Sequence, residues 1–159
     1  MRLTELFLAQ LEREAASTRR ALERMPEGRN DWKPHERSMP LGYLAALVAS
    51  MPSWIAFMVQ QDELDIASPE GAKFKPQVVS TSQGLVEALT NTTDEHLMTN
   101  WKFVVSGHVA DEKPRHIMIS DAVFSHLAHH CGQLTVYLRL NDAPVPAIYG
   151  PSADEGNFG

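Results

Sequence analysis

The sequence predicts an all-α fold, a four-helix bundle with one long crossover connection, in a single domain that spans residues 1–159. Four segments carry apolar residues every three or four positions, which is the period of an amphipathic helix. Proline and glycine separate these segments, and residues 63–79 are long and aperiodic, as expected of a crossover rather than a tight turn. A chain of 159 residues with 43% hydrophobic side chains suits one core.

The first helix is predicted from Leu3 to Met25, because apolar positions recur there at helical spacing with Glu and Arg between them. Pro26 and Gly28 end this pattern. Residues 30–36 have no period and are predicted to form a loop. The apolar face consists of Leu3, Phe7, Leu11, Ala15, Thr18, Leu22 and Met25.

The second helix is predicted from about Pro40 to Gln61, since proline is well tolerated in a first helical turn. Pro52 lies inside the apolar stripe and removes one backbone hydrogen bond. We therefore expect a kink near Val48 and a pocket beside it. The stripe consists of Leu41, Leu44, Ala45, Val48, Met51, Ile55 and Met58.

The last two helices are separated by a segment with two open interpretations. A third helix is predicted from Ser80 to about Thr99, with Ser80 and Gln83 resembling a capping box. Residues 101–119 form either a short extended pair or a structured, irregular loop. The fourth helix is predicted from Ser120 to about Leu140, with Ser120 as its cap.

Charge and composition exclude several function classes. Fourteen basic residues against twenty acidic ones give a formal net charge of -6, so we expect no nucleic-acid partner and no anionic membrane partner. The lone Cys131 excludes an intramolecular disulfide. No apolar run reaches eighteen residues, and the N-terminus lacks the apolar stretch of a signal peptide. A soluble, cytoplasmic protein is expected.

Three of the seven histidines fall within five residues of the fourth predicted helix: His126, His129 and His130. His126 and His130 lie about 40° apart around the helix and about one turn apart along it. Two imidazoles at this spacing can chelate one zinc or nickel ion. The alternative is that one histidine packs in the core while the others lie at the surface or at a subunit contact. His129 lies about 100° around from His130 and is less suited to share its site.

Several segments together resemble the DinB family of bacterial proteins. The resemblance covers essentially the whole chain and is carried by residues 126–134 with 137–139, 31–36, 41–45, 52–54 and 146–155. It implies a four-helix bundle, often a homodimer, in which three histidines hold a nickel or zinc ion, one on the second helix and two on the last. Relatives include thiol-dependent S-transferases and isomerases, and other members are classed as metal-dependent hydrolases. The family name does not imply DNA binding.

The resemblance carries two of the three metal ligands over to this chain. His126 and His130 match the two histidines of the last helix, whereas the position of the third ligand is occupied by Leu47. Between residues 37 and 62 the second helix has no His, Cys, Asp or Glu, so a shift of register cannot supply one. The thioether of Met51 is poorly suited to zinc or nickel. The standard three-histidine site is therefore incomplete.

Two neighbours of the histidine pair have modest expected roles. Cys131 stands where the family usually has arginine, and a buried cysteine on a helix is most often a small hydrophobe. Gln133 either orients His129 or His130 or lies at the surface.

Two functions follow as hypotheses, and the sequence identifies no catalytic residue for either. The first is a metal-dependent hydrolase or thiol S-transferase with a degenerate histidine site, in which His96, His116, Asp121 or solvent replaces the third ligand. The alternative is a non-catalytic bundle without metal that binds a small molecule beside Leu47, Met51, Trp54 and the histidines. A weaker third hypothesis is an interaction protein, a dimer that uses Trp32, Trp54 and Trp101.

Overall fold

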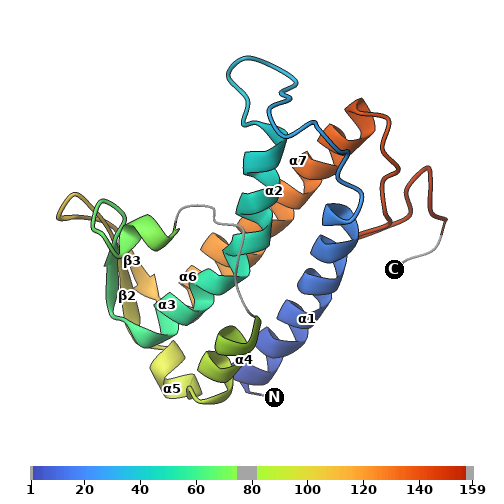
Figure 1. Ribbon diagram of the computed structural model, residues 1–159. Helices are drawn as coiled ribbons and strands as arrows, with labels where there is room; N and C mark the ends of the chain where they lie inside the picture. The colour runs from blue at the N-terminus through green and yellow to red at the C-terminus, as the bar shows by residue number, and fades with distance from the viewer. Residues whose placement is uncertain (1, 75–81, 157–159) are drawn as a thin grey trace.

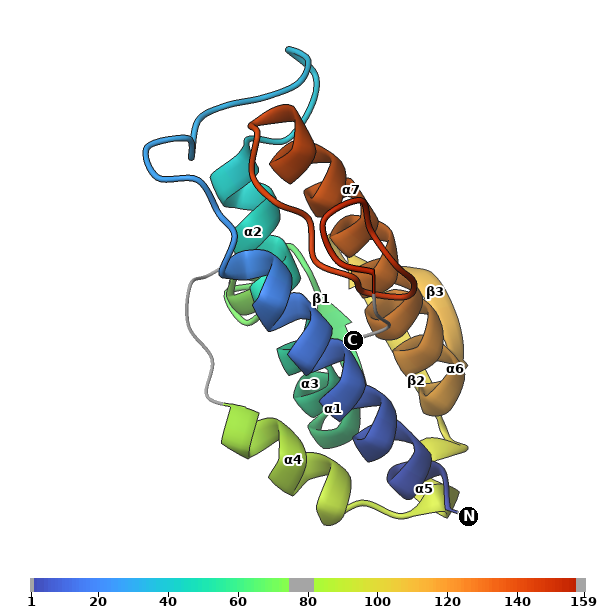
Figure 2. The ribbon, with the colours of Figure 1, turned by 90° about the vertical axis from the view of Figure 1, so that its right-hand side faces the viewer.

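Three helices form the body of the fold, which a computed structural model describes for residues 2–74 and 82–156. Helices α1 (Leu3–Leu22), α2 (Leu41–Ser50) and α7 (His126–Leu140) pack against one another, and α2 runs antiparallel to α7 (Figure 1). Helix α4 (Ser82–Thr90) covers α1 and α3 (Trp54–Gln60) at the lower end (Figure 2). This arrangement buries the apolar stripes predicted from the sequence.

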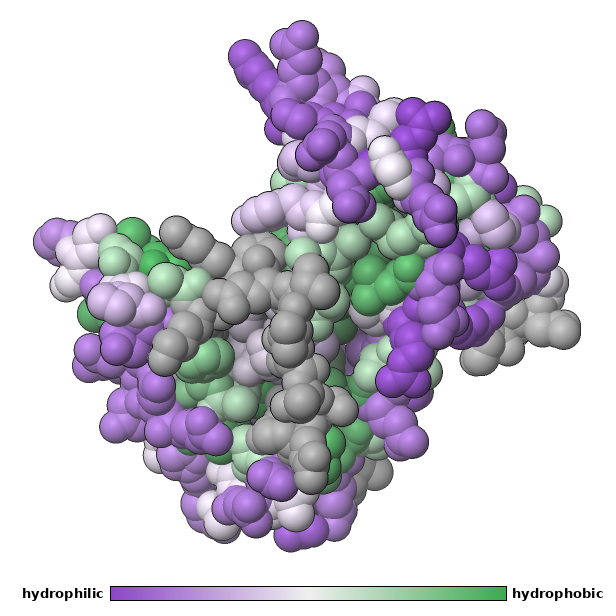
Figure 3. Space-filling view, viewed as in Figure 1, coloured by the Kyte–Doolittle hydropathy of each residue, from purple (hydrophilic) through white to green (hydrophobic). Residues whose placement is uncertain are grey.

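Helix α1 follows the predicted helix closely and ends three residues before the predicted boundary. Its N-terminus receives a carboxylate from another element: Asp94 accepts hydrogen bonds from the backbone N–H groups of Leu3 and Thr4. A carboxylate at this position compensates the unpaired amides and the positive end of the helix dipole. The loop that follows α1 stands at the top of Figure 1 and presents a hydrophilic surface in Figure 3.

The second predicted helix is present as three consecutive helical pieces. Between α2 and α3 the backbone forms a 3₁₀ turn, Met51–Ser53, which contains Pro52. Proline has no N–H to donate, and the tighter turn accommodates this break. The stretch Leu41–Gln60 is long and apolar enough for a membrane span by length and composition, but the same is true of a soluble protein's core helix, and 44% of this stretch is buried in the fold.

The prediction of an all-α fold is wrong, because a three-stranded mixed sheet lies beside the helices. Strand β2 (Asn100–Val105) pairs antiparallel with β3 (His108–Pro114) and parallel with β1 (Glu63–Asp65). Of the two interpretations left open for residues 101–119, the extended pair is the correct one. Ser106 and Gly107 both have positive φ, 51° and 78°, as a two-residue type I′ hairpin turn requires. Strand β1 is too short to show a period in the sequence.

One carboxylate joins β1 to the hairpin turn. The Oδ1 atom of Asp65 accepts hydrogen bonds from the N–H groups of Ala67 and Ser106, at 2.8 and 3.0 Å, and its Oδ2 atom accepts from Gly107 at 2.7 Å. These hydrogen bonds hold the pKa of Asp65 below its ordinary value, and the bond from Ala67 has the largest effect. The ionised carboxylate therefore stabilises the sheet.

Asp65→Ala should destabilise the protein near neutral pH and much less in acid. A carboxyl group whose pKa is lowered by folding stabilises the folded state above its unfolded pKa, about 4, and loses this contribution as the pH falls through the folded value. The urea midpoints of the wild type and Asp65→Ala, measured by circular dichroism, should differ at pH 7 and converge as the pH falls through the folded pKa of Asp65. Glu36→Ala, on the loop at the other end, is the control. A difference that persists unchanged in acid would contradict this role of the ionised form.

The remaining helices differ in their boundaries from the prediction. The third predicted helix is divided into α4 and the short α5 (Asp94–Leu97). The division occurs because the Thr93 side chain caps a new helix by accepting a hydrogen bond from the backbone N–H of His96. The capping box predicted at Ser80 lies outside the described residues. The fourth begins earlier than expected, as α6 (Arg115–Ile119), and continues through a π-helix, Ser120–Ser125, into α7.

The C-terminal segment after α7 packs along α1 and α7 (Figure 2). Glu155 forms ion pairs with Arg20 of α1 and with Arg24 in the turn after α1, and Asp154 forms one with Arg139 of α7. Ala147, within this segment, is buried. The tail is therefore part of the folded structure.

Candidate functional site

The structure brings His126 and His130 together at the start of α7. Their Nε2 atoms are 2.9 Å apart and their ring centroids 4.6 Å apart. His130 is buried, with 7% of its surface exposed, and His126 is half-buried. The i, i+4 spacing alone produces this approach, because the two side chains lie on one helix face.

The outer nitrogens of both rings face hydrogen-bond acceptors. Nδ1 of His130 is 2.7 Å from Oε1 of Gln133, so the ring nitrogen donates to this oxygen. The backbone carbonyl of Ala122 interacts with the ring of His126, whose Nε2 already faces His130. When both Nδ1 atoms are protonated, the two neutral rings present their Nε2 lone pairs to each other; when either Nε2 atom is protonated, the 2.9 Å contact is a hydrogen bond between the rings.

Burial lowers the pKa of both histidines. For His126 the next cause is the charge of His130, and for His130 the hydrogen bond to Gln133 opposes the effect of burial. Both rings are consequently neutral at neutral pH. Neutral imidazole is the form that binds a metal ion.

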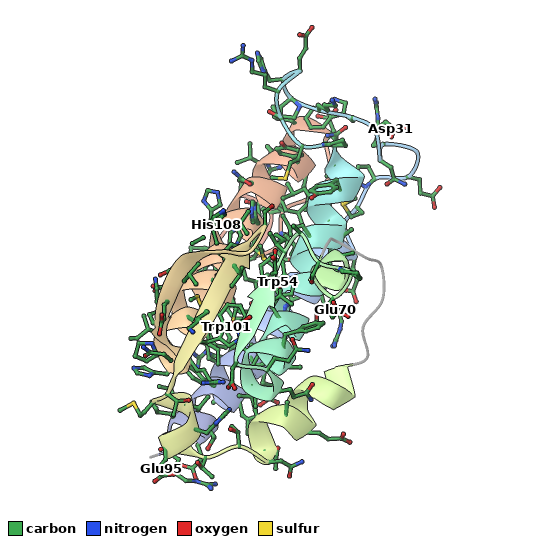
Figure 4. The ribbon with its side chains drawn as sticks, turned by 90° about the vertical axis from the view of Figure 1, so that its left-hand side faces the viewer. Asp31, Trp54, Glu70, Glu95, Trp101 and His108 are labelled. Atoms are coloured by element: carbon green, nitrogen blue, oxygen red, sulfur yellow. The ribbon has the colours of Figure 1, made fainter. Side chains whose placement is uncertain are left out.

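The α2–α3 side of the pair is apolar. The Trp54 ring of α3 lies 5.9 Å from the His126 ring, centroid to centroid, and Trp54 lies within the body of the fold (Figure 4). Leu47, two turns before Trp54 and therefore on the same helix face, is buried, and so is Met51. Because α2 is antiparallel to α7 and packs against it, the part of the chain that precedes Trp54 runs along the part of α7 that follows His126 (Figure 1).

A π-helix that was not predicted from the sequence immediately precedes His126. The segment Ser120–Ser125 has i→i+5 geometry between the regular helices α6 and α7. Single π-turns of this kind often occur at functional sites, because they change the direction of the side chains and carbonyls around them. Ala122, whose carbonyl meets His126, lies within this turn.

The pair fits two ligands of a metal ion but not a complete three-residue site. Two nitrogens that are each about 2.0–2.1 Å from one ion are about 2.9 Å apart at the right angle of square-planar nickel and about 3.3 Å apart at the tetrahedral angle of zinc, so the observed 2.9 Å matches the right angle. Among the described residues no group of three or more His, Cys, Asp or Glu could hold a metal. Residues 1, 75–81 and 157–159 contain none of these residue types.

The residues suggested as a replacement ligand have other partners. Nε2 of His96 is 2.8 Å from the Val59 carbonyl, and Nδ1 of His116 is 3.2 Å from the Leu97 carbonyl. Asp121 is exposed and pairs with Lys113. His129, also exposed, contacts the edge of the His130 ring at a centroid distance of 4.9 Å. Water or a substrate would therefore have to complete the coordination.

Cys131 has the environment of a structural thiol. It is 1% exposed and its Sγ atom lies 3.5 Å from the Thr18 hydroxyl of α1. Burial raises the pKa of this thiol, which keeps the thiolate fraction small at neutral pH. The expectation of a small hydrophobe agrees with this environment.

The tryptophans do not form a common exposed surface. Trp101 is completely buried, and within the described part of the chain its Nε1 atom has no hydrogen-bond partner. Trp32 stacks edge-on against Tyr137, with ring centroids 5.5 Å apart. A dimer interface built on Trp32, Trp54 and Trp101 together is therefore incompatible with their burial.

Two cavities lie away from the histidine pair. One of about 530 Å³ lies between the end of α1 and the outer face of α2 and is lined by Leu22, Met25, Tyr43 and Ala49 among others. The other, of about 500 Å³, lies between α3 and α4 and includes His96 and Glu87. Neither is lined by Leu47, Met51, Trp54 or the histidines of α7, so neither is the small-molecule pocket predicted from the sequence.

A solved structure with a similar fold is a DinB-like protein from Bacillus cereus ATCC 10987. The two chains are 24% identical, the TM-score is 0.65, and the match covers 91% of this chain and 97% of that one. No family model matches the chain, and no curated protein matches it. The similarity shows that the fold is DinB-like.

Proposed function

We propose that this chain, with its DinB-like fold, binds a divalent nickel or zinc ion through His126 and His130 and uses it in a hydrolysis or thiol S-transfer reaction on a small molecule. The observation that carries the proposal is the convergence of the two Nε2 atoms at 2.9 Å. Gln133 and the Ala122 carbonyl offer one acceptor to each ring, so the tautomer in which both Nε2 lone pairs are available to one cation has an acceptor for each ring proton.

The residues around the pair divide the site into a closed and an open part. Buried Leu47 and Trp54 exclude water on the α2–α3 side. His126 is half-buried, which leaves access for water or substrate. A bound divalent cation would lower the pKa of a coordinated water or thiol. The chain itself orients the ligands and limits the solvent around them.

Titration calorimetry of the metal-free, untagged protein with Ni²⁺ and Zn²⁺ tests metal binding. We expect one site per chain and a loss of affinity of about 100-fold or more, about 2.7 kcal/mol, in His126→Ala and in His130→Ala, because one imidazole alone competes poorly with water. His129→Ala is the matched control, since it removes an exposed histidine of the same helix turn, and it should change the affinity by less than about threefold.

Equal binding by the wild type and both pair variants would show that the metal binds elsewhere. No binding by the wild type would refute the metal proposal and favour the non-catalytic small-molecule-binding bundle. Hydrolase and thiol-transfer assays become meaningful once the stoichiometric site is established. The resemblance further leads us to propose that the protein is cytoplasmic and forms a homodimer. Sedimentation analysis of the purified chain would test the dimer.

A further inference from the structure

We infer that Gln133 is a positioning residue that selects the tautomer of His130 and thereby keeps the histidine pair open to a cation. Its amide oxygen accepts the Nδ1–H of His130 at 2.7 Å. Only the effect of this tautomer on metal binding rests on the proposed function. The tautomer itself is a property of the metal-free protein.

The two rings are held in different ways. A hydrogen bond to the backbone carbonyl of Ala122, which has no proton to donate, opposes the lowering of the pKa of His126, and when Nδ1 makes this bond the lone pair of the ring lies on Nε2. The π-helix supplies this carbonyl, since it displaces the backbone just before α7.

His130 has a real choice between two tautomers. With the proton on Nδ1 it donates to Gln133, and its Nε2 lone pair faces that of His126. With the proton on Nε2 it would instead donate to His126 across the 2.9 Å contact and close the pair. In the second arrangement the two rings form a hydrogen bond with each other, and no lone pair between them remains available to a cation.

Gln133 decides this competition because it lies one turn beyond His130 on the same helix face and holds its oxygen toward the ring. A pair with two lone pairs in contact is satisfied only by a proton or a cation between them. The hydrogen bond to the neutral amide of Gln133 thus compensates for the lost hydrogen bond between the two rings, and it adds no charge to the site.

The nitrogen chemical shifts of ¹⁵N-histidine in the metal-free protein, recorded at about pH 8 where the rings are neutral, test the inference directly. We expect His130 to carry its proton on Nδ1 in the wild type and on Nε2 in Gln133→Met, whose unbranched side chain has nearly the same length and no strong acceptor. Gln133→Glu should keep the proton on Nδ1. Val136→Ala, one turn further along an exposed face of α7, is the control.

The metal affinity provides the second readout. Gln133→Met should lose about 10–100-fold in Ni²⁺ affinity, whereas Gln133→Glu should retain it. An unchanged His130 tautomer in Gln133→Met would overturn the inference. A tautomer that switches in a protein that binds no metal at all would support the role of Gln133 and refute the proposed function instead, so the two failures are distinguishable.

Discussion

Arg115→Met should lower the free energy of unfolding by about 3–5 kcal/mol, a large fraction of the roughly 5–15 kcal/mol that stabilises an ordinary domain. The Arg115 side chain is 1% exposed, and the five N–H donors of its guanidinium group all have acceptors. Nε donates to the carbonyl of Met58 at 2.8 Å, and Nη1 and Nη2 donate to those of Asn100 and Gln61. The remaining acceptors are the side chains of Thr99 and Asp62.

The reason for the large effect is that Arg115 satisfies carbonyls that no helix or strand partner can reach. Met58 and Gln61 lie at the C-terminal end of α3, where the last carbonyls of a helix lack partners. Asn100 begins β2. Each buried acceptor left without a donor costs about 1–3 kcal/mol. Arg115 therefore holds the end of α3, the start of the sheet and α6 together.

Urea unfolding followed by circular dichroism measures this effect. Arg115→Lys should be intermediate, because an ammonium group keeps the charge but has only three donors. Asp62→Ala is the control: its side chain is 93% exposed, and losing this one partner of Arg115 should cost less than about 1 kcal/mol. A loss below about 1 kcal/mol for Arg115→Met would show that water replaces the guanidinium.

The helices were predictable because their signals are local. The apolar spacing of α1 and of α2 with α3 gave their extent to within a few residues. The sheet was not predictable in this way, because the parallel pairing of β1 with β2 joins residues 63–65 to residues 102–104, which are distant in the sequence. Three residues are too few to show an alternating period, and strand pairing depends on contacts that are distant in the sequence.

The same division applies to the site. The i, i+4 spacing was sufficient to place His126 beside His130, since one helix positions both. The Trp54 contact joins two separate helices, and the π-helix has no recognisable sequence signature. Arg115 follows Lys113 and Pro114 in a polar stretch that is typical of the surface, so nothing in the sequence marked it as a buried cation.

Leu47→His should raise the affinity for Ni²⁺ by about 100-fold, about 2.7 kcal/mol, if the third ligand position of the resemblance is correct. Leu47 is buried on the helix face that continues into Trp54, whose ring contacts His126. Helix α2, which carries Leu47, packs antiparallel against α7, which carries both histidines (Figure 1). An imidazole there would add a third nitrogen to the two that already converge.

Calorimetry of Leu47→His beside Ala49→His separates a new ligand from a mere additional histidine. Ala49 is exposed on the same helix, so its variant carries the same substitution away from the pair and should bind Ni²⁺ as the wild type does. Combining Leu47→His with His130→Ala should return the affinity to near that of the wild type, because two imidazoles remain. A folded Leu47→His protein with unchanged affinity would contradict the assignment of this position. A gain in affinity would mean that one leucine separates this chain from a complete three-histidine site.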